Sequence, residues 1–233
     1  MVAAGLLLAA AWSSLSSLTT AKDTNCSARI AAACERLQGE LGSSVILRPS
    51  DAGYDELSEV NWSQTAWKDP VCIAQPGDTA QVQAIVKTLS KKKVPFAVRS
   101  GGHSPNPLDA NIDEGVLLSL NNLNKVVYDA EKEIATIGSG GRWIDVYTEL
   151  QKDGVVVVGG RVPPVGVGGL ILGSGLSYLS DLYGMACDNI VSYEVVLADG
   201  SVVEASETSH SDLWWALKGG ANNFGRFSID CYA

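Results

Sequence analysis

Three glycine-rich segments constrain the fold of this chain more than any other feature of its sequence. They span residues 99–104, 165–175 and 219–225, and each borders stretches with strand or helix periodicity. Glycine accepts positive φ angles and lets the backbone approach a ligand closely. Successive backbone N–H groups in such loops form a concave anion site. We therefore expect the loops to gather around a phosphorylated cofactor, with three ordinary turns as the alternative.

The surroundings of these loops narrow the choice of function. The first loop follows a predicted strand, and the second runs into a predicted helix whose N-terminus would favour an anion. Neither GxxxxGK[ST] nor a dinucleotide-binding β-α-β unit is present. A serine hydrolase is disfavoured because no GxSxG occurs and only His103 and His210 could serve as its base. His103 lies inside the first loop, which makes it a candidate functional residue as well as a candidate structural one.

The apolar spacing between the loops predicts an α+β fold in two lobes, because strand pairs follow helices without the regular alternation of a Rossmann fold. Residues 47–63 read as a polar connection. Helices are predicted over residues 26–41, 79–89, 143–150 and 211–217. Strands are predicted over residues 72–75, 95–99, 116–120, 125–128, 134–137, 155–158, 189–197 and 202–204.

The second predicted helix carries the clearest local signals. Asp78 is the expected N-cap, and Gln81 three residues later would complete a capping box. Val82, Ile85, Val86 and Leu89 follow at helical spacing and should be buried. The basic run 91–93 suits the solvated C-terminal end of this helix.

The N-terminus resembles a secretory signal. Residues 2–12 are apolar but too short to span a bilayer, and Thr19 and Ala21 suit cleavage after Ala21. An uncleaved helix is the alternative, since no Lys or Arg precedes the apolar run. We therefore divide the chain into a signal peptide (1–21), an N-terminal helix with a connecting segment (22–66) and a main domain (67–233), and we expect a secreted protein. Asn25 and Asn61 open N-x-S sequons and are candidate glycosylation sites.

The composition of the chain disfavours some classes of partner and a metal site. The net charge of −9, without a cluster of Lys or Arg, disfavours nucleic acid, and no further stretch is long enough to span a membrane. None of the five cysteines forms a CxxC pair and only two histidines are present, so we expect no metal site. In an oxidising compartment Cys34 and Cys72 could pair. The odd count leaves at least one thiol free or joined to another chain.

Four motifs resemble those of FAD-linked oxidases of the vanillyl-alcohol-oxidase and berberine-bridge-enzyme type. They are residues 95–104, 164–169, 184–191 and 212–220, and they occur in the order and spacing of that family. The resemblance implies a two-lobed PCMH-type FAD-binding domain with FAD extended between the lobes. A separate substrate domain would lie over the flavin ring.

The resemblance also implies roles for individual residues. His103 matches the histidine that bonds covalently to a methyl carbon of the isoalloxazine ring. The remaining cofactor-binding residues implied are Arg99, Ser100, Gly101, Gly102, Ser104, Val165, Gly166, Val167, Gly168, Gly169, Asp188, Asn189, Ile190, Gly220, Asn223 and Gly225.

Two departures from the family pattern matter. Many relatives carry a cysteine just before the second loop that forms a second bond to the flavin, but residues 160–164 contain none and Cys187 does not match that position. We therefore expect one covalent bond, through His103. The tail 226–233 does not match the strand that leads into the substrate domain. No residue is assigned as catalytic base, and we expect the chain as given to load flavin weakly and to lack turnover.

Three hypotheses follow for function. The first is an FAD-dependent oxidase that takes a hydride from an alcohol, sugar or secondary metabolite and passes the electrons to O2. The second is a non-catalytic remnant that at most binds FAD. The third is a secreted binding module without flavin, which predicts a colourless protein.

Overall fold

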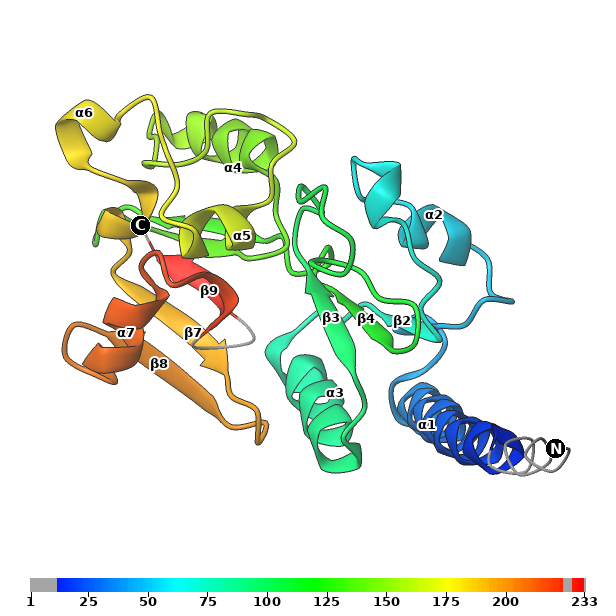
Figure 1. The fold of residues 1–233 in the computed structure, drawn as a ribbon. Helices are drawn as coiled ribbons and strands as arrows, with labels where there is room; N and C mark the ends of the chain where they lie inside the picture. Colours follow the sequence, from blue (N-terminus) through cyan, green and yellow to red (C-terminus); the bar gives the residue numbers. More distant parts are fainter. Residues whose placement is uncertain (1–11, 224–227, 233) are drawn as a thin grey trace, which may run out of the picture.

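The computed structural model describes residues 12–223 and 228–232, which form two lobes that each combine helices with a sheet (Figure 1). The α-helices are α1 Trp12–Leu41, α2 Tyr54–Ser58, α3 Thr79–Lys92, α4 Trp143–Leu150, α5 Val167–Leu172, α6 Ser180–Tyr183 and α7 Ser211–Leu217. The 3₁₀ turns are η1 Gln64–Ala66, η2 Gln151–Asp153, η3 Ala186–Asn189 and η4 Ala221–Asn223. The strands are β1 Ile46–Leu47, β2 Cys72–Ala74, β3 Phe96–Arg99, β4 Val116–Ser119, β5 Val126–Asp129, β6 Ile134–Gly138, β7 Ser192–Val196, β8 Val202–Ser206 and β9 Ser228–Tyr232.

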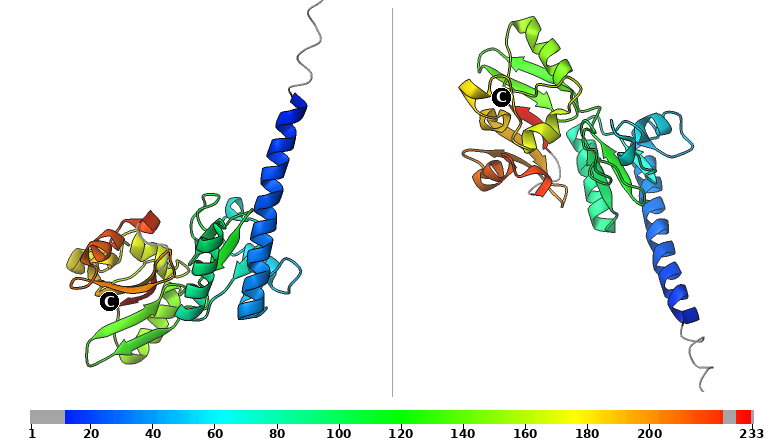
Figure 2. Two further views of the ribbon diagram at one scale, coloured as in Figure 1. Left: turned by 90° about the horizontal axis from the view of Figure 1, so that it is seen from below. Right: turned by 45° about the horizontal axis from the view of Figure 1, so that its top comes forward.

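The first lobe is built on a four-stranded sheet in the order β1-β2-β4-β3. Strands β2, β3 and β4 are parallel, and β1 pairs antiparallel with β2. Alternate residues of these strands face opposite sides, so Cys72 and Leu118 pack with α1 and α3, whereas Ile73 and Leu117 pack with Tyr54 of α2. Burial of both faces explains why β2 is apolar throughout and why β4 is apolar up to the buried Ser119. The right-hand view of Figure 2 shows α1 extending well beyond this lobe.

Helix α3 begins as its sequence predicts, with one difference in the cap. Asp78 Oδ1 accepts a hydrogen bond from the Gln81 backbone N–H at 2.8 Å. The Gln81 side chain accepts from the backbone N–H of Gly77 rather than from that of Asp78, so the predicted capping box is only half formed. The four predicted apolar residues are buried, and Lys93 ends the helix in the left-handed region.

The second lobe holds an antiparallel five-stranded sheet in the order β5-β6-β9-β7-β8. Its core gathers Trp143 and Val146 of α4, Val167 of α5 and Leu217 of α7 against the sheet. The side-chain hydrogen bonds that tie the lobes together include those from Thr79 Oγ1 to Glu194 and from Gln83 Nε2 to the Gly200 carbonyl. The α+β class and the two-lobed arrangement agree with the sequence prediction.

The segments on which sequence and structure disagree lie where local pattern is a weak guide. Helix α1 starts at Trp12 and runs without a break through Ala21, the predicted cleavage position; residues 1–11 lie outside the described residues. The connection 47–63 contains the short helix α2.

One strand prediction is wrong, and one strand forms where none is predicted. Residues 155–158 form no strand, and Val156 is 63% exposed. Within the described part of the chain, neither sheet includes this segment. The tail contains β9, which pairs with β6 on one side and β7 on the other. Backbone pairing on both sides makes a strand of this segment although its residues do not resemble the family's strand.

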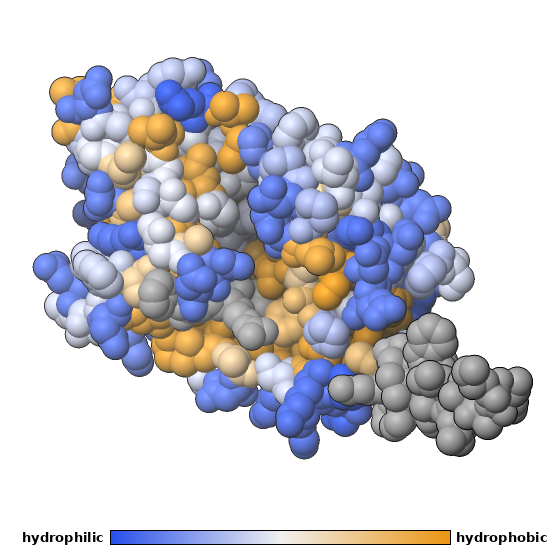
Figure 3. Space-filling view, viewed as in Figure 1, coloured by the Kyte–Doolittle hydropathy of each residue, from blue (hydrophilic) through white to orange (hydrophobic). Residues whose placement is uncertain are grey.

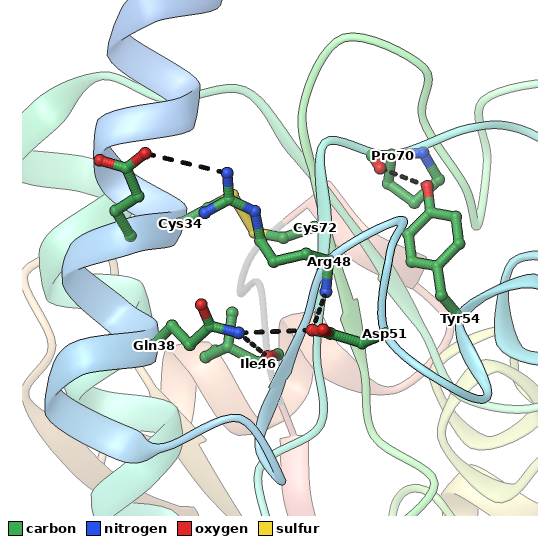
Figure 4. The surroundings of a disulfide bond; sticks show 9 residues. Cys34, Gln38, Ile46, Arg48, Asp51, Tyr54, Pro70 and Cys72 are labelled. Carbon is green, nitrogen blue, oxygen red and sulfur yellow. Dashed lines mark hydrogen bonds and ion pairs between the residues drawn. A yellow bond between two sulfur atoms is a disulfide. The ribbon is translucent and has the colours of Figure 1, made fainter.

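The disulfide between Cys34 and Cys72 confirms the predicted pairing and joins α1 to the sheet (Figure 4). Around it, Gln38 donates to the Ile46 carbonyl and to Asp51, which also accepts from the Arg48 backbone N–H. Among the cysteine side chains that the structure describes, Cys26 and Cys187 are free. The disulfide thus fixes the N-terminal segment on the first lobe.

Removing this disulfide should lower stability substantially. The bond closes a loop of 38 residues, and chain entropy assigns a loop of that length a stabilisation of about 3–4 kcal/mol. We expect Cys34→Ser to lower the free energy of unfolding by about that amount, measured by urea denaturation under oxidising conditions. Cys26→Ser is the matched control and should leave the midpoint unchanged. Equal midpoints for all three proteins would contradict this role for the disulfide.

Candidate functional site

A cavity of about 1160 Å³ is lined by loops of both lobes. The first-lobe wall comes from the end of β3 and the loop after it, and the second-lobe wall from residues 165–176 and the turn around Ser139. Apolar surface gathers between the two lobes in Figure 3. The volume lies slightly above the range usual for ligand pockets, so the cavity suits a large, extended ligand.

Many of the residues predicted from the sequence line this cavity. They are Ser100, Gly101, Gly102, His103, Ser104, Val165, Gly166, Gly168 and Gly169. The structure therefore brings the first two glycine-rich loops together, as predicted. The third contributes Ala221 and Asn222 rather than the predicted Gly220 and Asn223.

The backbones of the two loops approach each other closely at a pair of glycines, Gly101 and Gly166. A Cβ atom on Gly166 would lie 2.3 Å from the backbone nitrogen of Gly101 and 2.5 Å from its Cα. A Cβ atom on Gly101 would meet Gly166 at the same distances. No residue with a side chain fits either position unless the backbones move apart, so these two glycines are required for the close approach of the loops.

Side chains then hold the crossing in place. The Arg142 guanidinium donates from one nitrogen to the carbonyl of Gly101 at 2.6 Å and to that of Pro164 at 2.5 Å, which links the first loop to the second. Ser100 Oγ donates to the Ser139 carbonyl at 2.6 Å. These contacts preorganise the cavity wall before any ligand binds.

The start of α5 contributes less than the sequence suggests. The backbone N–H of Val167 donates to the Gly141 carbonyl, and that of Gly168 donates to the Ser139 carbonyl. Val167 itself is fully buried in the core of the second lobe. The first two N–H groups of this short helix are therefore engaged by the protein and are not free for a phosphate.

His103 lies at the wall of the cavity and is exposed. Gly102 before it has φ 65°, which explains why glycine is needed there and confirms the positive φ that its place in the loop predicts. After it, Ser104 Oγ donates to Asp109 at 2.6 Å. The imidazole makes no hydrogen bond within the described residues, so its nitrogens can react with a ligand in the cavity.

The sequence predicts Arg99 at the cofactor, but the structure places its side chain outside the cavity lining. Its side chain is only 1% exposed and points away from the cavity, donating to the Leu57 carbonyl at 2.6 Å, to Asn61 Oδ1 and to Ser119 Oγ. Burial and, less strongly, the charge of Arg142 lower the pKa of Arg99 to about 10. Arg99 therefore fastens the segment after α2 to the sheet and is not among the residues that line the cavity.

Substituting Arg99 should accordingly affect folding first. Arg99→Lys cannot reach all three acceptors, and the orphaned buried groups should lower the free energy of unfolding by about 2–4 kcal/mol. Urea denaturation of the flavin-free chain checks this value. If Arg99→Lys keeps wild-type stability and loses only affinity for FAD, the direct role in cofactor binding predicted from the sequence is correct instead.

The predicted glycosylation of Asn61 disagrees with the folded structure. Its side chain is 2% exposed and accepts the hydrogen bond from Arg99, so an attached glycan has no room. The structure says nothing of the side chain of Asn25, which remains a prediction.

Other predicted residues lie behind the cavity wall. Asp188 Oδ2 accepts from the backbone N–H of Met185, and Asn189 donates to the carbonyls of Tyr183 and Met185. They thereby hold the turn that brings Met185 into the lining. Ile190 is buried and its carbonyl accepts from Trp214. Asn223 bonds back to the Gly220 carbonyl, and Gly225 lies outside the described residues.

Two residues that shape the site were missed. Ser139 lies in the turn of residues 138–141, a fourth concentration of glycine between a strand and a helix that could have been recognised by the same criterion as the others. A Cβ on Gly140 would lie 1.7 Å from the Leu120 carbonyl oxygen, which shows how tightly this turn packs. Arg142 has no comparable signal, because its two acceptors are distant in sequence.

The residues present fit a cofactor such as FAD. Among the described residues, the lining contains no Lys or Arg, so an anionic group there would be held by backbone N–H groups and by hydroxyls of these residues. The Ser139 hydroxyl is buried in this wall and has no protein partner among the described residues. The Phe96–Val98 strand segment and Leu170, Leu172 and Leu176 supply an apolar surface suited to a flat ring system.

Metal ions and membranes are two further kinds of partner. No group of three or more His, Cys, Asp or Glu side chains within the described part of the chain is arranged to hold a metal ion. None of the described helices combines the length and the apolar character that crossing a lipid bilayer requires.

Residues 70–206 match the family described as the FAD binding domain. Among curated proteins, the chain is 44% identical over 192 residues to an FAD-dependent monooxygenase of Arthrobotrys oligospora. It is 46% identical over 194 residues to the bifunctional solanapyrone synthase of Alternaria solani. These alignments cover 82% and 83% of the chain but 37% of each relative, so the chain spans little more than a third of their length.

Solved structures show the same similarity. The glucooligosaccharide oxidase of Acremonium strictum, described as carrying a 6-S-cysteinyl, 8α-N1-histidyl FAD, superposes with a TM-score of 0.77 at 30% identity. The 6-hydroxy-D-nicotine oxidase of Arthrobacter nicotinovorans superposes with a TM-score of 0.76 at 32% identity. The matches cover 87% and 81% of this chain, and 42% and 41% of those chains.

Proposed function

The chain belongs to the FAD binding domain family, and from this membership we propose that it holds FAD in the cavity between its lobes, covalently attached to His103. The observation that carries the proposal is the position of His103, which is exposed at the wall of the cavity. The two loops that form this part of the wall meet at Gly101 and Gly166. The glucooligosaccharide oxidase, whose FAD carries a histidyl bond, supports the same attachment here.

The chain's own residues explain how such a cofactor would be held. Ser100 and the backbone around Gly101 to Gly102 offer polar groups on the first-lobe wall, and Ser139 offers its hydroxyl on the second-lobe wall. The apolar end of β3 and the leucines of residues 170–176 offer a surface for the ring. FAD supplies the redox chemistry, accepting a hydride from a substrate. The protein would position the cofactor and exclude water from it. The covalent bond would prevent the cofactor from dissociating.

We propose a single covalent bond. Residues 160–164, which lie just before the second loop, contain no cysteine. Cys187, the free thiol nearest in sequence after that loop, is 4% exposed and not part of the cavity lining. Burial, with the nearby charge of Asp188, raises the pKa of its thiol, which makes it a poor nucleophile at neutral pH.

For the whole protein we propose oxidation of a small organic substrate such as an alcohol, a sugar or a secondary metabolite, with O2 as the electron acceptor. The oxidases and monooxygenases among the relatives support this class of reaction. We also propose that the protein follows the secretory route. The Cys34–Cys72 disulfide supports that route, since such bonds persist in oxidising compartments.

The visible spectrum of the purified chain tests the proposed cofactor. We expect flavin absorbance that co-elutes with the protein, and FAD rather than FMN in a digest. A colourless protein that also fails to take up added FAD would contradict the proposal and would favour a binding module without flavin.

A further inference from the structure

Residues 61–65, which precede the part of the chain that matches the family, form a clamp on the His103 loop. The backbone N–H of Trp62 donates to the Gly102 carbonyl at 3.3 Å. The Trp62 indole Nε1 donates to the carbonyl of His103 itself. Farther along, Thr65 Oγ1 donates to the Pro105 carbonyl at 2.6 Å. Three donors of this clamp therefore bind the carbonyl group of His103 and those of Gly102 before it and Pro105 after it.

The clamp is anchored in the first lobe. Asn61 is buried and bonded to the equally buried Arg99, and the Trp67 indole donates to the Asn61 carbonyl at 2.7 Å. A Cβ atom on Gly102 would lie 3.3 Å from the Asn61 Cα, so loop and clamp are in close contact. The position of the His103 backbone is thus tied to the sheet through Arg99 and Asn61.

The ring of Trp62 also lies near the imidazole. The two ring centroids are 6.0 Å apart, and the planes are tilted by 37°. Trp62 is 64% exposed, although its backbone N–H and its indole N–H both donate to this one loop. Because the imidazole has no hydrogen bond of its own within the described residues, its orientation depends on the backbone that Trp62 fixes and on this neighbouring ring.

We propose that Trp62 is a positioning residue for covalent attachment of the flavin to His103; this inference rests on the proposed function. The attachment joins an imidazole nitrogen to the ring methyl carbon. One hydrogen leaves each atom as a proton, and the two electrons released pass through the flavin to O2, which forms H2O2. The reaction needs the nitrogen and the methyl carbon held at near-contact distance, so its rate depends on how firmly the loop is held.

The rate of covalent incorporation tests this role separately from cofactor affinity. Flavin-free chain is mixed with FAD in air, and samples are precipitated with acid over time to measure the flavin retained by the protein. The dissociation constant for FAD is measured on the same samples by fluorescence quenching at times before attachment. A purely structural defect would weaken affinity, whereas a positioning defect slows the covalent step.

Trp62→Phe keeps an aromatic ring but lacks the indole N–H. We expect covalent incorporation to slow by about tenfold, with FAD affinity changed less than twofold, because displacement of a reacting group by a fraction of an ångström costs rate rather than binding. Trp62→Leu, which also lacks the ring, should be slower still. Thr65→Val leaves Trp62 intact and should slow the step by only about threefold, consistent with one lost hydrogen bond farther from the histidine.

Trp215→Phe is the matched control, because Trp215 is 75% exposed on α7 and does not contact the His103 loop. It should incorporate flavin at the wild-type rate. Wild-type incorporation rates in both Trp62 variants and in Thr65→Val would overturn the positioning role while leaving the proposed function intact. Absence of covalent flavin in the wild type itself would overturn both.

Discussion

His103→Ala should lose its flavin completely on acid precipitation, whereas the wild-type chain should keep its yellow colour in the pellet. His103 is the histidine that the fold places at the cavity wall, exposed and with an imidazole free of hydrogen bonds to the described residues. Alanine removes the imidazole that would form the covalent bond, so the retained fraction should fall from nearly all to none. FAD can still bind reversibly to the variant, since the glycine crossing is untouched.

His210→Ala provides the matched control. His210 is the chain's other histidine, and its ring contacts Ser209 and the Glu204 carbonyl in the turn before α7, outside the cavity lining. This variant should retain covalent flavin like the wild type. Retained colour in denatured His103→Ala would show that another residue carries the bond and that the assignment is wrong.

Gly166→Ala should abolish FAD binding and destabilise the fold. The new methyl group would lie 2.3 Å from the Gly101 backbone nitrogen and 2.6 Å from Ser100 Oγ. Backbone on one side and the Ser100–Ser139 hydrogen bond on the other leave no side chain that can simply swing away. Forcing the loops apart should cost about 3 kcal/mol of unfolding free energy and should lower FAD occupancy at least tenfold.

Two glycines serve as comparisons for this variant. An added methyl at Gly39 of α1 meets nothing within 4 Å, and Gly39→Ala should leave stability unchanged or slightly higher. Gly169→Ala also meets no protein atom within 4 Å, although Gly169 lines the cavity. A stable Gly169→Ala chain with reduced FAD occupancy would place the cofactor against α5. Wild-type occupancy in Gly166→Ala would contradict the view that the loop crossing forms the binding site.

Local signals in the sequence predicted the elements that depend on local interactions. The helix of residues 79–92 could be predicted because its cap and its apolar stripe lie within a few residues of each other. The hairpin of β5 and β6 likewise depends on alternation around one turn. The tail strand β9 depends instead on backbone partners in β6 and β7, which no short window of sequence contains.

The same distinction applies to the site. Glycine concentrations predicted the loops, since glycine is the residue that close backbone approach requires. The direction of a side chain could not be read in this way. Arg99 belongs to the family motif yet points to Leu57 and Asn61, and Asp188 and Asn189 support a turn rather than a ligand. Arg142 and Trp62 act through acceptors about 20 to 41 residues away, and these contacts appear only in the fold.

Peptide mapping of the purified wild-type chain tests the central claim most directly. After tryptic digestion, the peptide of residues 100–125, which contains His103, should appear with an added mass of one FAD less two hydrogen atoms. Fragmentation should place that mass on His103, and the peptide containing Cys187 should be unmodified. Flavin that is released entirely on denaturation, or a flavin mass mapped to any other residue, would contradict covalent attachment of FAD at His103.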